Sequence, residues 1–157
     1  DNQTDSSIVS LTDFYATFAE MTKYKLPDNE GEDSFSMWPL LTRKGKSARK
    51  DIVHHSIDGN FSIRDKEWKL LFCAGSGGWS HPRRNEEILS QLPPVQLYNM
   101  QDDAGERVNL ENEYPQIVKR MTATMRRYIL DGRSVPGQKQ TNETTGEWKQ
   151  TVLFMNE

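Results

Sequence analysis

The stretch CAGSGGWSHPRR, residues 73–84, gathers residue types that can do chemistry. It holds the only cysteine of the chain, Cys73, and places Ser80 and His81 behind a run of glycines. A loop of this composition can cradle a phosphate on backbone amides, carry a thiol or hydroxyl nucleophile, or form one wall of a pocket whose chemistry lies elsewhere. The surrounding residues decide between these three uses.

The glycines of this stretch lack the partners of a phosphate-binding loop. Such a loop places Lys-Ser or Lys-Thr after its glycines at a helix start, because the amides and the helix dipole must converge on one anion. Here Gly75, Gly77 and Gly78 are followed by Trp-Ser-His-Pro. A nucleophilic Cys73 would need a base and an exposed, electropositive setting, whereas it ends an apolar run. We therefore interpret Cys73 as a packed thiol.

Two of the histidines, His54 and His55, are adjacent in a segment that we expect to be a strand. Their side chains should point to opposite faces and cannot easily share one metal ion. A site built from one of them with His81 and Asp58 would need a ligand spacing that the sequence does not show. We expect a buried, hydrogen-bonded histidine and no metal ligand in this chain.

The composition indicates a single domain that is poor in apolar residues. Of the 157 residues, 34% are hydrophobic and 27% are charged, so either much of the chain is loop or it packs against something else. The net charge of -3 gives no field that would attract nucleic acid or an anionic membrane surface. We interpret the basic run at residues 43–50 as a solvated loop.

The cysteine count and the first residues limit the class of protein further. A lone cysteine excludes an internal disulfide framework and a multi-cysteine zinc site. No apolar run approaches the roughly 18 residues that span a bilayer, and the first residues lack the regions of a signal peptide. The chain does not begin with Met and enters a helical pattern almost at once. We expect it to be a piece of a longer protein.

Two helices should position the rest of the chain. The first is predicted over residues 11–23 behind a cap at Ser10. Its apolar residues recur at helical spacing: Leu11, Phe14, Tyr15, Phe18 and Ala19. The second runs from Pro115, which suits a first helical turn, to Gly132, which suits a C-terminal cap. An apolar stripe that includes Met121 and Met125 should place this helix across one face of a sheet.

Four strands are predicted between the helices. Asp58-Gly59 is a hairpin signal between residues 51–57 and 60–65, and further strands follow over 67–74 and 95–100. The last two are joined by about twenty residues that begin with the opening stretch, and loops of that length are usually functional or disordered. The tail after residue 134 should be extended, with a short strand near its end. The fold class is α+β: a four-stranded antiparallel sheet packed against a long C-terminal helix.

Several phrases together resemble one family. VSLTDFYATFAEMTKYKLP, with Pro39-Leu40-Leu41 after it, resembles the segment that closes the catalytic domain of type I sulfatases. IVHHSIDGNFSIRDKEWKLLFCAGSGGWSHP is similar to the first strands and loop of their C-terminal subdomain. QLYNMQDDAGERVNLENEYPQIVKRM resembles its continuation, with an Asp-x-x-Glu-x-x-Asn-Leu turn before the helix. The resemblance covers residues 8 to about 137.

The resemblance implies sulfate ester hydrolysis in an alkaline-phosphatase-like protein. It assigns residues 1–50 to the end of the catalytic domain and a connecting loop, and residues 51–157 to the C-terminal subdomain. The family's nucleophile is a formylglycine made from Cys or Ser in a Cys/Ser-x-Pro-x-Arg motif beside a calcium ion. Ser80-His81-Pro82-Arg83-Arg84 fits that pattern formally. We reject it, because the family's motif lies near the N-terminus at a helix start, whereas Asn-Glu-Glu-Ile-Leu follows here.

These considerations assign no catalytic residue to the chain, which alone should be inactive. The resemblance implies that the loop after the third strand reaches the mouth of the substrate pocket. The expected substrate-binding residues are Ser76, Gly77, Trp79, Ser80, His81 and His55. The alternative use of this loop is packing on the neighbouring domain alone.

The expected partners are the protein's own catalytic domain, which would hold the calcium and formylglycine, and a sulfated sugar or aryl sulfate. A periplasmic or secreted bacterial location is expected. Two other functions stay open: a stand-alone carbohydrate-binding or interaction module, and a phosphodiesterase or phosphonate hydrolase of the same superfamily.

Overall fold

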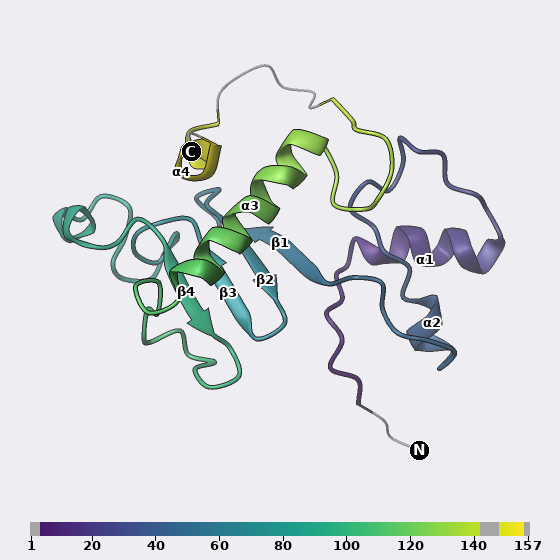
Figure 1. Ribbon diagram of the computed structural model, residues 1–157, viewed down its shortest axis with the longest axis horizontal. Helices are drawn as coiled ribbons and strands as arrows, with labels where there is room; N and C mark the ends of the chain where they lie inside the picture. The colour runs from purple at the N-terminus through teal and green to yellow at the C-terminus, as the bar shows by residue number, and fades with distance from the viewer. Residues whose placement is uncertain (1–3, 142–147, 156–157) are drawn as a thin grey trace. The chain divides into compact units, whose positions relative to one another are not determined.

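The computed structural model describes residues 4–141 and 148–155, which divide into two compact units. The first unit comprises the described residues up to Ile52 and those from Tyr128 to residue 141. The second comprises Val53 to Arg127 with residues 148–155. Along the chain, the division falls within strand β1 (Asp51–His55) and within helix α3 (Pro115–Asp131), both labelled in Figure 1. The assignment of residues 1–50 to a catalytic domain stays a prediction.

A four-stranded antiparallel sheet forms the centre of the second unit. Its strands follow one another in chain order: β1 (Asp51–His55), β2 (Phe61–Asp65), β3 (Trp68–Leu71) and β4 (Gln96–Asn99). The Asp58-Gly59 turn forms as predicted: Gly59 takes a φ of 78°, and the Ser56 N–H donates to the Asn60 carbonyl at 2.9 Å. The predicted strand over 67–74 is shorter than expected, because the ladder ends where the long loop begins.

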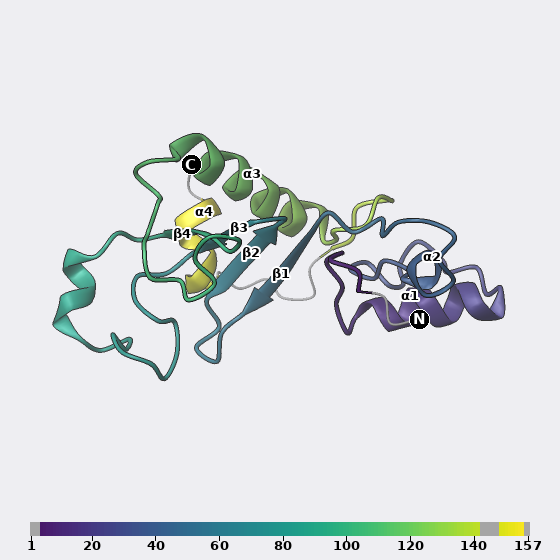
Figure 2. The ribbon, with the colours of Figure 1, turned by 90° about the horizontal axis from the view of Figure 1, so that it is seen from below.

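The core of this unit lies between the sheet and helix α3 (Pro115–Asp131), which crosses one face of it (Figure 2). Register places Ile63 opposite Leu70, and Leu70 opposite Leu97, in one row across the sheet. These three side chains are at most 1% exposed, and Met121 and Met125 of α3 are also buried. The alternation of strand side chains thus gives one apolar face to the helix and leaves a second face for polar residues. The predicted α+β sandwich is confirmed.

The end of the chain is helical, so the predicted final strand is wrong. Residues 149–155 form a 3-10 turn, η2 (Lys149–Thr151), followed by the short helix α4 (Val152–Met155). A helical turn directs Phe154 inward, where its ring lies 4.6 Å from that of Phe72 and 6.2 Å from that of Phe61. Phe154 is completely buried. Burial of this single aromatic ring outweighs the β-propensity of the segment.

The first unit contains helix α1 (Asp13–Thr22) and the short helix α2 (Trp38–Leu41). The predicted helix over 11–23 is confirmed, but its inward face is small and polar: Asp13, Ala16, Thr17 and Ala19. The larger apolar side chains lie on the exposed face. The rings of Phe14 and Phe18 stack on each other on this face, with their centres 5.6 Å apart.

The interpretation of residues 43–50 as a fully solvated loop is wrong at one position. Arg49 is buried, where its Nε donates to Asp13 Oδ2 at 2.8 Å and its guanidinium lies 4.7 Å from the Phe35 ring centre. Asp13 supplies the acceptor that makes this burial tolerable. A second arginine, Arg133, is also buried, and its Nη1 donates at 2.8 Å to the backbone carbonyls of Asp28 and Gln138. This arginine anchors the tail, whose residues 142–146 lie outside the described range.

Candidate functional site

The long loop between β3 and β4 is held in place by bonds to its backbone. Gln96 on β4 donates from Nε2 to the carbonyls of Cys73 at 2.8 Å and Gly75 at 2.7 Å. Ser76 closes the next turn, because its N–H donates to the Pro82 carbonyl at 3.0 Å and its hydroxyl donates to the Ser80 carbonyl at 2.6 Å. The loop therefore follows a defined path, and its later part forms the 3-10 turn η1 (Glu87–Gln91).

The tip of this loop presents Trp79 to solvent. The indole is 78% exposed, while the Trp79 carbonyl accepts from Arg83 Nε at 2.9 Å. His81 is exposed and lies 2.9 Å from a Glu86 carboxylate oxygen through Nδ1, and the peptide bond between His81 and Pro82 is cis. The structure thus fixes the backbone of the tip and leaves the side chains of Trp79, Ser80 and His81 exposed.

Cys73 is a packed thiol, as predicted. Its side chain is buried, and burial raises the pKa of the thiol above its ordinary value, although Lys69 acts in the opposite direction. Gly77 lies against it with a φ of 66°, and a Cβ added at Gly77 would stand 3.1 Å from Cys73 Sγ. Glycine at this position lets the loop backbone approach the end of β3.

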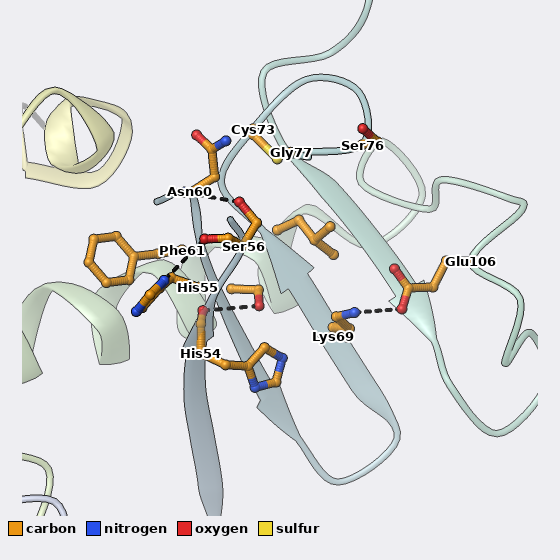
Figure 3. Close-up of a pocket in the computed structure, with 12 residues that line it drawn as sticks. His54, His55, Ser56, Asn60, Phe61, Lys69, Cys73, Ser76, Gly77 and Glu106 are labelled. Carbon is orange, nitrogen blue, oxygen red and sulfur yellow. Dashed lines mark hydrogen bonds and ion pairs between the residues drawn. The ribbon is translucent and has the colours of Figure 1, made fainter. Parts of the chain in front are cut away.

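A pocket of about 190 Å³ lies beside Cys73, on the face of the sheet opposite α3 (Figure 3). Its lining includes His54, Asn60, Lys69, Cys73, Ser76 and Glu106. Three of the six expected substrate-binding residues contribute to this lining: Ser76, Gly77 and His55. The other three, Trp79, Ser80 and His81, belong to the loop tip and do not line it. The structure therefore separates the expected set into a pocket wall and an exposed tip.

The two adjacent histidines point in different directions from β1, as the strand geometry predicts (Figure 3). His55 packs edge-on against Phe61, with ring centres 6.2 Å apart, and its Nδ1 lies 3.1 Å from the Ser56 carbonyl. The pKa of His54 is lowered by partial burial and by the positive charges of Lys69 and Arg64. Both residues are exposed, as is His81, so the expectation of a buried histidine is wrong. β1 is an edge strand of the four-stranded sheet.

Lys69 and Glu106 are pocket residues that sequence reasoning missed. Their Nζ and Oε1 atoms lie 2.5 Å apart, and both side chains are largely shielded from solvent. Side chains alternate between the two faces along β3, so Lys69 lies on the face opposite Leu70. This alternation is visible in the sequence and could have identified Lys69 as a candidate site residue. Glu106 lies 37 positions later in a turn, and no local pattern connects the two.

The Asp-x-x-Glu-x-x-Asn-Leu turn after β4 explains how Glu106 arrives at the pocket. Asp103 Oδ2 accepts from the backbone amides of Arg107 at 2.6 Å and Val108 at 2.9 Å. These bonds lower the pKa of Asp103, so the carboxylate that shapes the turn stays ionised. Asn109 Oδ1 accepts from the Leu97 N–H at 2.9 Å and ties the turn to β4. Asp103 and Asn109 of this motif hold the turn in place, and Glu106 between them lines the pocket.

In the part of the chain that the structure describes, no group of three or more His, Cys, Asp or Glu side chains is arranged to hold a metal ion. In residues 4–141 and 148–155, no helix is both long and apolar enough to cross a bilayer.

Comparison with known proteins finds sulfatases. The chain is 28% identical to mouse arylsulfatase J in an alignment of 148 residues that covers 73% of this chain and 24% of that protein. It is 23% identical over 116 residues to the N-acetylgalactosamine-6-O-sulfatase of Bacteroides thetaiotaomicron, covering 74% of this chain and 22% of that protein. The chain therefore spans about a quarter of the length of these relatives. No family model matches it.

Solved structures share the fold at low sequence identity. One comes from work on glycosaminoglycan metabolism by Bacteroides thetaiotaomicron, with a TM-score of 0.56, 21% identity, and coverage of 72% of this chain and 23% of that chain. Another holds its substrate D-glucosamine-2-N,6-O-disulfate, with a TM-score of 0.52, 21% identity, and coverage of 73% and 22%. The chain is thus similar in sequence to sulfatases, and its four-stranded sheet with packed helices has the fold of their C-terminal subdomain.

Proposed function

We propose that this chain is the C-terminal part of a sulfatase, a sulfuric ester hydrolase, and that it completes the substrate pocket of a catalytic domain. The observation that carries the proposal is the agreement between sequence similarity to two sulfatases and the fold of the second unit. The relatives are about four times as long as the matched region, which leaves room for a catalytic domain in a longer parent protein.

The first unit supports a partner of this kind. Phe14 and Phe18 on the outward face of α1 are 43% and 55% exposed and stack on each other, and Leu11, just before the helix, is 85% exposed. Met21 and Tyr24 are also exposed, at 48% and 57%. An exposed apolar surface of this kind is typical of an interface rather than of a solvated helix. We assign it to contact with the parent protein's catalytic domain.

The loop tip supplies the substrate contact in this proposal. Trp79 offers a flat aromatic face that suits a sugar or aryl ring, and its exposure leaves that face free for a ligand. Ser76 and Gly77 lie at the base of the loop. In this proposal Ser80 and His81 contribute polar groups at the loop tip, and His55 contributes one at the pocket wall. The substrate class is a sulfated sugar or an aryl sulfate, in line with relatives whose names include an arylsulfatase and an N-acetylgalactosamine-6-O-sulfatase.

The chemical step belongs to the parent's catalytic domain. Calcium and a formylglycine there would supply the charge stabilisation and the nucleophile. We assign no metal ligand and no catalytic role to the described residues of this chain. The chain alone should therefore show no aryl sulfatase activity, and we propose that the parent is periplasmic or secreted.

The test is Trp79→Ala in the parent protein, with Ile88→Ala as its control. Ile88 is also exposed in the same loop, at 45%, but lies outside the tip. We expect kcat/KM on a sulfated substrate to fall about tenfold or more in the Trp79 variant, with an unchanged melting temperature. The Ile88 variant should behave like wild type. Unchanged kinetics in both variants would contradict the assignment of the tip to substrate.

The sequence of the parent protein distinguishes a sulfatase from the two other functions that stay open. A Cys/Ser-x-Pro-x-Arg segment upstream in the reading frame supports the sulfatase. A Thr or unmodified nucleophile there would indicate a phosphodiesterase or phosphonate hydrolase of the same superfamily. A reading frame without any catalytic domain would indicate a stand-alone carbohydrate-binding or interaction module.

A further inference from the structure

The pocket on the sheet face opposite α3 differs in its chemistry from the loop tip. We infer that this pocket binds one unsulfated sugar ring through paired donors and acceptors. The inference rests on the proposed function only for the source of the ring, a neighbouring residue in a sulfated carbohydrate. Binding itself is a property of this chain.

The size of the pocket sets the size of the ligand. Its volume of about 190 Å³ is smaller than the roughly 300–1,000 Å³ of pockets that hold drug-sized ligands. A single six-membered ring is therefore the appropriate occupant. The pocket is open to solvent beside His54 and His55, which are exposed, so a ring at the end of a longer chain can enter from there.

The charges of the pocket favour a neutral ligand over an anion. Lys69 supplies a positive charge, but Glu106 lies 2.5 Å from it and neutralises that charge within the pocket wall. Partial burial and nearby cations lower the pKa of His54, so this ring is neutral at pH 7. A sulfate group would meet the Glu106 carboxylate beside any contact with Lys69, and that repulsion disfavours it.

The hydrogen-bonding groups match adjacent sugar hydroxyls. A hydroxyl both donates and accepts, so a sugar ring needs donors and acceptors side by side. Lys69 donates only and an ionised Glu106 accepts only, and the two stand next to each other (Figure 3). Among the described residues, none hydrogen-bonds the side-chain amide of Asn60, which adds a free donor and a free acceptor at the pocket wall. Leu71, on the same face of β3 as Lys69, provides apolar wall for the C–H face of a ring.

The probes are methyl β-D-galactopyranoside, N-acetyl-D-glucosamine and sodium sulfate, titrated into the 157-residue chain at constant ionic strength. Binding is followed by amide chemical shifts. We expect saturable shifts at Ser56, Asn60 and Gly77 with at least one sugar, with a dissociation constant on the order of 1–10 mM. Sulfate should cause none. Asn60→Ala should weaken sugar binding about tenfold, while Asn85→Ala, an exposed control in the long loop, should not.

The Glu106→Gln variant is a second test, in which the preference of the pocket for sugar over sulfate should reverse. It removes the negative charge beside Lys69, so sulfate should now shift the pocket amides while sugar binding weakens. The inference is overturned if neither sugar saturates these amides up to about 50 mM, well above the expected constant. It is also overturned if sulfate saturates them in the wild-type chain, or if the shifts centre on Trp79. Loss of sugar binding in Asn60→Ala, with loss of aryl sulfate hydrolysis only in Trp79→Ala, separates this inference from the proposed function, because an aryl sulfate has no neighbouring sugar ring for the pocket.

Discussion

Arg49 and Asp13, which are 36 residues apart in the sequence, form a buried ion pair through two hydrogen bonds. Asp13 begins α1 and also accepts from the backbone amides of Ser10 and Phe35, each at 2.9 Å. Arg49 donates further to the Asp33 carbonyl at 2.8 Å. One carboxylate and one guanidinium therefore fix the start of the helix, the acidic loop and the approach to β1 within the first unit.

Removal of Arg49 should destabilise the chain strongly. Arg49→Met keeps the apolar stem but leaves the Asp13 carboxylate buried without its cation, which costs about 3–5 kcal/mol. Lys46→Met removes an exposed charge from the same basic run and should cost less than about 0.5 kcal/mol. The free energy of unfolding in urea measures both. Equal values for the two variants would contradict a structural role for the pair.

The same pair should make stability sensitive to acid. Burial alone would raise the pKa of Asp13, but hydrogen bonds from Arg49 and from the Phe35 and Ser10 amides lower it below its ordinary value of 3.8. A lowered folded-state pKa stabilises the fold above the unfolded value, and that stability is lost as the pH falls through the lowered pKa. We expect the free energy of unfolding to fall below about pH 4. The fall should be smaller in Arg49→Met, and parallel pH curves would be evidence against it.

Phe154 should carry a large part of the stability of the second unit. Phe154→Ala leaves a cavity against Phe61 and Phe72 and should cost about 3–5 kcal/mol. The adjacent Leu153 is 42% exposed, and Leu153→Ala should cost about 1 kcal/mol or less. Urea unfolding followed by near-ultraviolet circular dichroism reports on the aromatic cluster. A small effect for Phe154→Ala would mean that the C-terminal turn does not complete this core.

Gly75 should be the glycine on which the long loop depends. Its φ is 74°, and an added Cβ would stand 2.5 Å from Leu89 Cδ2 and 2.8 Å from the Pro82 carbonyl oxygen. Gly75→Ala should therefore cost about 1–3 kcal/mol. Gly78→Ala is the matched control, because its Cβ would meet only the exposed Ile57 side chain at 3.3 Å. Melting temperatures compare the two, at about 2–4 °C per kcal/mol, and an equal loss for both would refute the argument.

Local signals in the sequence predicted most of the fold. Asp58-Gly59 set the first hairpin, and Pro115 and Gly132 bounded the long helix, because each acts through backbone conformation that a few neighbouring residues determine. The final segment was read as a strand from its β-prone residues. Its helical form depends on Phe154 finding a cavity between distant rings, and no short window of sequence contains that information.

The candidate site was predictable to a smaller extent. The packed thiol of Cys73 followed from the apolar run around it, and the glycine-rich loop stood out by composition. The partnership of Lys69 with Glu106 could not be predicted, since a turn 37 positions away supplies the acid. The burial of Arg49 inside a basic run was hidden for the same reason, because its partner Asp13 lies in another element.

The bonds that hold the long loop end almost entirely on backbone atoms. Gln96 and Ser76 donate to the carbonyls of Cys73, Gly75, Ser80 and Pro82, so each of these bonds is accepted by a backbone oxygen. The backbone path of the loop therefore does not depend on the side chains at its tip. Substitutions at Trp79 or His81 can accumulate during evolution without a penalty in the sheet. The loop is therefore a place where such proteins can acquire new ligand preferences while the scaffold stays the same.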